Sequence, residues 1–208
     1  MRAGPDRQAA LEQYRRRAGV YDLELALFEP VRREAVARLA PAPGETVIDF
    51  GCGTGLSLPL LRAGVGASGR VVGIEQSAEM LALARARVRR QRWRNVELIH
   101  APAEGACWPG QADAALFHFT HDLLQRPEAV AQALAMLRPG ARVVATGLRW
   151  APRWALAVNA AVYLAARRSV TTLQGLQQPW AGLERQLGPM QGRSRLLGAV
   201  YLVWGVRR

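Results

Sequence analysis

Two acidic residues in apolar, β-prone runs flank a glycine-rich turn. Asp49 stands near the end of the first run, and Gly51, Gly53 and Gly55 follow it. Glycine lets the backbone turn tightly and lets a ligand approach where a Cβ atom would collide. Glu75 ends the second run, and an acid at the tip of a second strand accepts hydrogen bonds from both hydroxyls of a ribose. The spacing therefore predicts a site for a ligand that contains a nucleoside.

A histidine and an acid stand next to each other in residues 113–122, which we predict to be the fourth strand and the loop beyond it. In an open α/β sheet, loops at the carboxyl ends of strands face the ligand crevice. His121 is a candidate general base, with Asp122 as its electrostatic partner. The alternative is that Asp122 caps the next helix and the chemistry depends on positioning alone. His118 and His121 have no further cysteine or histidine close in sequence, so we expect no metal site.

The remaining pattern predicts the elements that position these residues. Apolar residues at helical spacing predict a helix within residues 1–40, which the Pro- and Gly-rich residues 41–44 end. Strands and helices then alternate: strands at 46–50, 70–74, 96–99, 112–117 and 141–147, and helices at 78–92 and 127–137. This alternation predicts a parallel sheet with helices on both faces. Beyond it we expect helices at 153–166 and 179–187 and a strand at 196–206.

The glycine turn resembles the first motif of the class I methyltransferases that use S-adenosyl-L-methionine (SAM). Residues 137–141, Leu-Arg-Pro-Gly-Ala, are similar to the Leu-x-Pro-Gly-Gly turn of the same family. Residues 53–60 and the segment with Tyr14 and Tyr21 are similar to bacterial phospholipid N-methyltransferases. The resemblance implies a Rossmann-like, doubly wound α/β fold with a mostly parallel seven-stranded sheet and a C-terminal antiparallel hairpin. It also implies methyl transfer from SAM to a small-molecule or lipid acceptor, with phospholipid amines, quinone-type rings and natural products all open.

The resemblance also implies cofactor contacts along the first three strands. Asp49 and the backbone of the glycine turn belong to the part that faces the methionine moiety of SAM. Glu75 takes the ribose, and Gln76 flanks the adenine. The family often has an acid where this chain has Pro102. The N–H of Ala103 or the side chain of Glu104 is expected to serve the adenine instead.

Two further cofactor contacts are implied at the end of the fourth strand and in the N-terminal segment. Phe117 and His118 end the fourth strand, where they face the cofactor. Tyr21 either covers the cofactor, holds a cationic amine through its ring, or packs on the apolar face of a helix. Residues 1–40 are thus expected to form a helical cap, residues 41–148 the cofactor-binding core, and residues 149–208 an acceptor-side lid with the terminal strands.

Length and composition favour one soluble domain. The chain has 208 residues, of which half are hydrophobic and 21% are charged. No apolar run is long enough for a membrane span, and the N-terminus does not read as a signal peptide. A single disulfide between Cys52 and Cys107 would not stabilise a domain of this size as a disulfide framework does, so we expect both cysteines to be reduced. These features predict a cytoplasmic protein.

The charge distribution points to a partner for the C-terminal residues. The formal net charge is +12, and every basic side chain is arginine. Residues 149–208 hold nine arginines against the single acid Glu184. Within them, the apolar residues 153–166 are flanked by arginines, which suits a buried helix, a lid or a helix at a membrane interface. We therefore expect peripheral contact with an anionic membrane, at the inner membrane face, as a possible role of this segment.

Other function classes fit the sequence less well. An NAD(P)-dependent oxidoreductase more often has Gly-x-Gly-x-x-Gly, but Leu56 replaces its third glycine, and a chain without lysine has no Tyr-x-x-x-Lys pair. A nucleic-acid partner is not expected, because the chain has no Asn-Pro-Pro-Tyr motif and no interleaved aromatic and basic residues. A SAM-binding protein without catalytic activity stays open as an alternative to the enzyme.

Overall fold

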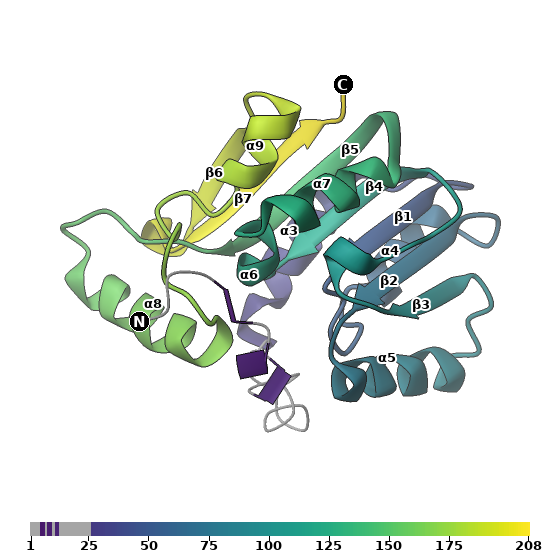
Figure 1. Ribbon diagram of the computed structural model, residues 1–208, viewed down its shortest axis with the longest axis horizontal. Helices are drawn as coiled ribbons and strands as arrows, with labels where there is room; N and C mark the ends of the chain where they lie inside the picture. Colours follow the sequence, from purple (N-terminus) through teal and green to yellow (C-terminus); the bar gives the residue numbers. More distant parts are fainter. Residues whose placement is uncertain (1–4, 7, 10, 13–25) are drawn as a thin grey trace.

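The computed structural model describes residues 5, 6, 8, 9, 11, 12 and 26–208 (Figure 1). The continuous part begins with the short helix η1 (Ala26–Phe28) and the helix α3 (Glu29–Leu39), after which Ala40 adopts a left-handed conformation with φ of 49°. The helix α3 confirms the end of the helical segment expected within residues 1–40. Tyr14 and Tyr21 lie outside the described residues.

Seven strands form one sheet in the order β3-β2-β1-β4-β5-β7-β6. Strands β1 to β5 are parallel neighbours, whereas β7 is antiparallel to both β5 and β6. This arrangement confirms the mostly parallel sheet and the C-terminal antiparallel hairpin. The strands are β1 (Thr46–Phe50), β2 (Arg70–Glu75), β3 (Val96–His100), β4 (Ala112–His118), β5 (Leu137–Leu148), β6 (Gln191–Arg195) and β7 (Val200–Val206).

Helices cover both faces because successive strand residues point to opposite sides of the sheet. Besides η1, α3 and the outer helix α8 (Leu156–Ser169), the helices include α4 (Leu58–Val65), α5 (Ala78–Arg90), η2 (Ala103–Gly105), α6 (His121–Leu124), α7 (Pro127–Ala135) and α9 (Ala181–Leu187). In β1, Val47 packs with α3 and α4, whereas Ile48 and Phe50 pack with α7 and α9. The helices α7 and α9 lie over the face turned toward the viewer in Figure 1.

Two parts of the last third differ from the expectation. The predicted turn at residues 137–141 lies inside β5, where Gly140 at φ of +82° makes a bulge and the register with β4 shifts. The predicted strand at 196–206 is wrong at its start. Residues Leu196–Gly198 form a tight turn, labelled η3, in which Leu196 and Leu197 have left-handed φ of 50° and 54°, which no strand allows. The edge strand β6, which precedes η3, is polar and exposed and has no apolar alternation to reveal it.

The helix α8 (Leu156–Ser169) lies on the outside of the molecule. Only Val162 and Ala166 are buried along its length, and Leu156 is 76% exposed. The apolar helix expected near residues 153–166 therefore exists, but it is not a core helix. Of the helices in the described part of the chain, none is long and apolar enough to cross a membrane.

Candidate active site

The carboxylate of Glu75 joins the end of β2 to the glycine turn. Its oxygens accept hydrogen bonds from the backbone N–H of Gly53 at 3.0 Å and of Ser77 at 2.8 Å. Burial raises the pKa of Glu75 above its usual value, although the backbone N–H groups favour the charged form. The two acid-and-glycine signals of the sequence thus meet in space, and the turn fixes the direction of the carboxylate.

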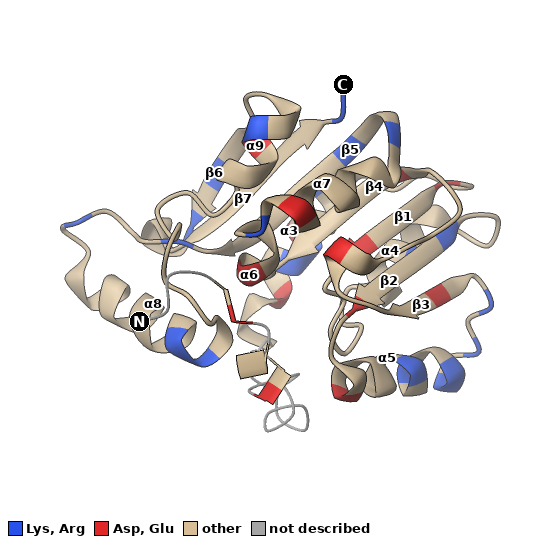
Figure 2. Ribbon diagram, viewed as in Figure 1, with Lys and Arg blue, Asp and Glu red and all other residues tan. Residues whose placement is uncertain are grey.

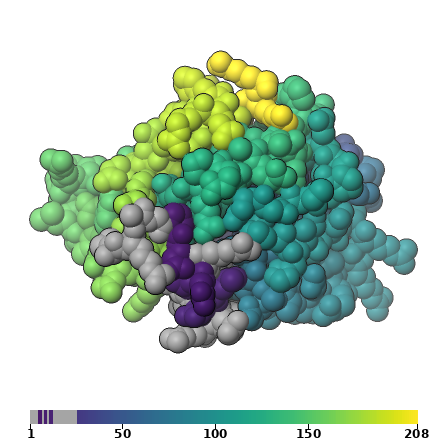
Figure 3. Space-filling view, in the orientation of Figure 1, coloured from purple at the N-terminus to yellow at the C-terminus, as the bar shows by residue number. Residues whose placement is uncertain are grey.

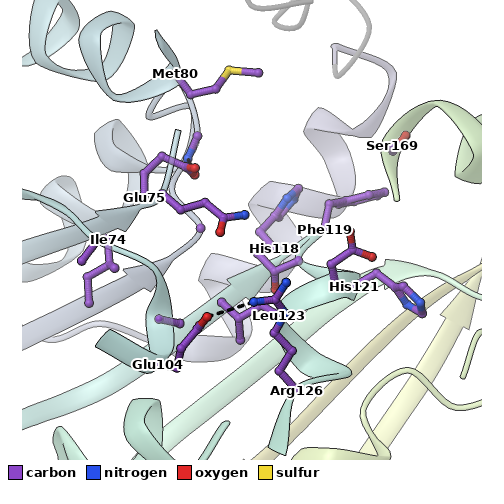
Figure 4. Close-up of a pocket in the computed structure, with 17 residues that line it drawn as sticks. Ile74, Glu75, Met80, Glu104, His118, Phe119, His121, Leu123, Arg126 and Ser169 are labelled. Carbon is purple, nitrogen blue, oxygen red and sulfur yellow. Dashed lines mark hydrogen bonds and ion pairs between the residues drawn. The ribbon is translucent and has the colours of Figure 1, made fainter. Parts of the chain in front are cut away.

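A pocket of about 820 Å³, partly open to solvent, lies beside Glu75 (Figure 4). The pocket lies at the carboxyl ends of β1, β2 and β4, where open α/β sheets bind ligands. Most of the residues expected from the sequence line it: Gly51, Gly53, Glu75, Gln76, Ala103, Glu104, His118, His121 and Asp122.

Three expected residues lie behind the pocket wall instead. Asp49 is 1% exposed, and Phe117 is fully buried and stacked on Phe50 with ring centroids 5.0 Å apart. Gly55 is buried where the turn meets α4, and a Cβ atom on it would lie 2.7 Å from Leu58 Cδ1. These residues shape the site from behind. Tyr21 lies outside the described residues.

The glycines of the turn have separate tasks. Gly51 and Gly53 line the pocket, with φ of 69° and 56°, a backbone conformation that other residues avoid. A Cβ atom on Gly51 would lie only 2.6 Å from Thr120 Cγ2. Gly51 is therefore needed so that the loop after β4 can pack on the turn, whereas Gly53 presents its N–H to Glu75.

Two buried charged side chains, Arg32 of α3 and Asp49 of β1, lie behind the pocket, and His118 of β4 lines it. Burial raises the pKa of Asp49 to about 7, with the charge of Arg32 lowering it and that of Glu75 raising it. Burial and the charge of Arg32 lower the pKa of His118 to about 3. Neither Asp49 Oδ2 nor His118 Nε2 has a hydrogen-bond partner among the described residues. His118 thus brings a neutral, unsatisfied ring nitrogen to the pocket.

His121 makes its hydrogen bond to the backbone. Its Nε2 lies 3.0 Å from the carbonyl oxygen of Gln174, which only accepts, so Nε2 carries the proton and Nδ1 the lone pair. Nδ1 is buried and has no partner in the described part of the chain. Burial lowers the pKa of His121, and the charge of Asp122 opposes that shift. The ring is therefore neutral near pH 7 and can accept a proton at Nδ1.

The carboxylate of Asp122 anchors Thr171, in the segment that follows α8, to α6. It accepts hydrogen bonds from the backbone N–H of Thr171 at 3.0 Å and from its hydroxyl at 2.7 Å. The same hydroxyl accepts from the backbone N–H of Asp6 at 2.9 Å. Asp122 lies in the first turn of α6 and makes no side-chain cap there. Through Thr171 it holds Asp6 and the end of α8 near the pocket.

The sequence did not reveal every pocket residue. Arg126 forms an ion pair with Glu104 at 2.9 Å, shown by the dashed line in Figure 4. Phe119 adopts φ of 58° and packs on Phe28, with ring centroids 4.7 Å apart. The sequence predicted that the loop after β4 borders the pocket, but the lining continues past Asp122 to Leu123 and Arg126. The unanticipated lining residues are Ile74, Met80, Ala101, Phe119, Thr120, Leu123, Arg126 and Ser169.

A family model described as "Methyltransferase domain" matches residues 47–140, from β1 to the bulge of β5. All lining residues of the pocket except Ser169 fall within this match. The chain belongs to the class I SAM-dependent methyltransferases. The family assignment predicted from the glycine turn is confirmed.

The curated relatives of this chain are named for different methyl transfers. A phosphatidylethanolamine N-methyltransferase from Cereibacter sphaeroides is 33% identical over 138 residues, which cover 65% of this chain and 66% of that protein. The O-methyltransferase cnsE from Penicillium expansum is 34% identical over 123 residues, 56% of this chain and 42% of that protein. The chain thus spans less than half the length of some curated relatives that it matches.

The fold agrees with that of solved methyltransferases. The N-methyltransferase NodS from Bradyrhizobium japonicum, in complex with S-adenosylhomocysteine, has a TM-score of 0.62 at 14% identity. The alignment covers 86% of this chain and 87% of NodS. At this identity the likeness shows the shared fold.

Proposed function

We propose that this protein binds SAM in the pocket beside Glu75 and transfers its methyl group to a small-molecule or lipid acceptor. The observation that carries the proposal is the Glu75 carboxylate, which the N–H of Gly53 holds at the edge of the pocket. A carboxylate so fixed accepts hydrogen bonds from a ribose. The family match over residues 47–140 supports the same cofactor.

The residues present fit this cofactor, and we assign them by the part of SAM that each would hold. Glu75 takes the ribose, and the backbone at Gly51 and Gly53 faces the methionine moiety. Gln76, with the Ala103 N–H or the Glu104 carboxylate, borders the adenine. His118 offers its unsatisfied Nε2 to the part of the pocket near the glycine turn. Buried polar atoms without partners are expected where a ligand completes the hydrogen bonding.

SAM supplies an electrophilic methyl group on a cationic sulfur. The chain's own task is to place the acceptor in line with it and to exclude water. His121 is the group that removes a proton from the acceptor, at Nδ1, where that acceptor is a hydroxyl or an acidic carbon. Asp122 positions the end of α8 beside His121 through Thr171.

We further propose that the acceptor is amphiphilic and is met at an anionic membrane surface on the inner face. The exposed helix α8 supports this, because its last residue, Ser169, lines the pocket. The cysteines Cys52 and Cys107 are both free, in keeping with the cytoplasm as the compartment. The relative that acts on phosphatidylethanolamine supports a lipid acceptor.

The test is methyl transfer from isotopically labelled SAM into lipid and metabolite extracts, followed by mass spectrometry. We expect at least one labelled product with wild-type protein, and much less of it with Glu75→Ala at a SAM concentration that does not saturate the variant. A protein that binds SAM but labels nothing in lipid, quinone or metabolite fractions would be a SAM-binding protein without this activity.

A further inference from the structure

Helix α8 carries apolar side chains on two faces, and the protein packs only one of them. Val162 lies in a small cluster with Ala151 and Ala199. On the other face Leu156 is 76% exposed and Leu164 is 60% exposed. Residues spaced by about four or eight positions share one face of a helix. The described residues leave this second stripe without apolar cover, which a surface helix normally requires.

The exposed stripe continues onto neighbouring segments. Trp154, just before α8, is 74% exposed, and Leu196 and Leu197 of η3 are 60% and 65% exposed. Both leucines are held at positive φ, a conformation that L residues avoid and that calls for a functional reason. Figure 3 shows that residues near 150–160 form a projecting edge of the molecule. We name Trp154, Leu156, Leu196 and Leu197 the apolar rim.

An arginine-lined hollow opens beside the apolar rim, separate from the active-site pocket. It is open to solvent and has a cavity volume of about 580 Å³; its lining includes the polar residues Arg149, Arg153 and Asn159 and the apolar residues Trp150 and Pro152. No carboxylate is among its lining residues. The hollow therefore carries positive charge without a balancing carboxylate in its lining.

Two guanidinium groups border this hollow, that of the partly buried Arg149 and that of the exposed Arg153. Arg149 has a buried Nε without a hydrogen-bond partner in the described structure, and its guanidinium lies 5.3 Å from the ring centroid of Trp180. Arg153 is exposed at the tip of the loop. Asn159 bonds the backbone of Ala151, which fixes the wall between them. Arginine forks match phosphate oxygens in geometry and charge.

We propose that the hollow receives the phosphate of an anionic phospholipid while the apolar rim enters the interfacial layer of the membrane. Tryptophan and leucine suit that layer, and arginine reaches headgroup phosphates from it. The proposal deepens the membrane contact given above and rests on it, but it does not depend on the methyl transfer. Docked in this way, the end of α8 at Ser169 leads from the membrane surface to the active-site pocket.

The test is co-sedimentation with phosphatidylglycerol and phosphatidylcholine vesicles at low and high salt. Wild-type protein pellets with phosphatidylglycerol at low salt only. Arg153→Gln lowers the partition coefficient about fivefold and Arg149→Gln/Arg153→Gln about 30-fold, as expected for arginines near an anionic surface. Trp154→Ser/Leu156→Ser lowers it by at least about tenfold, because the rim loses its apolar anchors.

The matched control is Arg89→Gln/Arg90→Gln, which removes the same charge from the exposed end of α5, at the opposite side of the molecule (Figure 2). This variant keeps at least about a third of wild-type partitioning. If Arg89→Gln/Arg90→Gln lost as much partitioning as Arg149→Gln/Arg153→Gln, the attraction would come from net charge alone and the proposed site would be overturned. Wild-type protein that pellets at neither salt concentration would also overturn it. Calorimetry measures the affinity for inorganic phosphate, which we expect to be weaker than the affinity for vesicles because free phosphate gives the apolar rim nothing to enter. Equally tight binding of inorganic phosphate would overturn the membrane as the source of the phosphate. SAM titration of each variant reports the fold, and a wild type that binds vesicles but not SAM would overturn only the proposed function.

Discussion

The backbone N–H of Gly53 donates a hydrogen bond to the carboxylate of Glu75 at 3.0 Å, and this contact joins the ends of β1 and β2. The second oxygen of the same carboxylate is held by the N–H of Ser77. Glu75 thus has a fixed direction before any ligand arrives. An acceptor that is already fixed loses no conformational freedom when a ligand binds, so the contact between Gly53 and Glu75 favours binding of the ribose.

Glu75→Ala should weaken SAM binding by about 1–3 kcal/mol, because a charged hydrogen-bond acceptor is lost. Gly53→Val should abolish it, since a branched side chain at φ of 56° distorts the turn. Isothermal titration calorimetry measures both. Glu97→Ala, on the partly exposed strand β3, is the control and should bind as wild type does. Unchanged affinity in Glu75→Ala would remove Glu75 from the site.

The carboxyl of Asp49 should make SAM affinity depend on pH. Burial raises its pKa to about 7, so the group is largely protonated at pH 6 and ionised at pH 8. A cationic sulfonium favours the ionised form, and affinity should therefore rise between pH 6 and 8. Asp49→Asn should flatten this profile. A wild-type profile as flat as that of Asp49→Asn would contradict the electrostatic role of the buried acid.

The carboxyl of Asp49 should also make the stability of the ligand-free protein depend on pH, with stability falling as the pH rises whereas SAM affinity rises. The pKa of Asp49 is raised from 3.8 to about 7 on folding, so its contribution favours the folded state below pH 3.8 and is lost as the pH rises through 7. Asp49→Asn should remove that part of the pH dependence. Thermal melts of both proteins between pH 5 and 8, each without ligand, measure the difference.

His121→Ala should lower kcat by roughly 100-fold while leaving SAM affinity nearly unchanged, if His121 is the base. Burial lowers the pKa of His121, so the acid limb of the wild-type profile should lie below the ordinary histidine value. Rates measured over pH 5–8 on the identified acceptor check both points. A fall of under about threefold would leave His121 as a wall of the pocket, and an amine acceptor methylated by proximity would then be favoured.

Gly51→Ala should destabilise the fold by about 1–3 kcal/mol through overpacking and positive φ. The added Cβ atom would lie 2.6 Å from Thr120 Cγ2. Thr120→Ser removes that methyl group, so the double variant should recover the steric part of the loss. Denaturant unfolding of the single and double variants measures the coupling. Additive effects would show that the methyl group is not the obstacle.

The parallel part of the sheet could be predicted from the sequence because each strand signals itself locally. Apolar runs such as residues 47–50 end at turns, and the acid at position 75 follows from strand spacing. The C-terminal part could not be predicted as well. Strand β6 is an exposed, polar edge, and η3 depends on two leucines in a left-handed conformation. Both are set by packing of residues far apart in sequence, such as Gly198 against Pro152.

The pocket was predicted in its cofactor half and less well elsewhere. The spacing of Gly53 and Glu75 in the sequence predicted that both would lie at the pocket. Ser169 lines the pocket because Asp122 accepts a hydrogen bond from the nearby Thr171, which no local pattern indicates. A hydrogen bond across 49 residues leaves no local pattern. Asp49 was expected at the cofactor, but its side chain lies behind the pocket wall and can act on a ligand only through its charge.

Calorimetric titration of the wild-type protein decides whether the glycine turn and Glu75 form a SAM site. We expect saturable binding of SAM and of S-adenosylhomocysteine, with no heat from NADH under the same conditions. Binding of NADH without binding of SAM would contradict it, because the same acid and turn would then serve a dinucleotide.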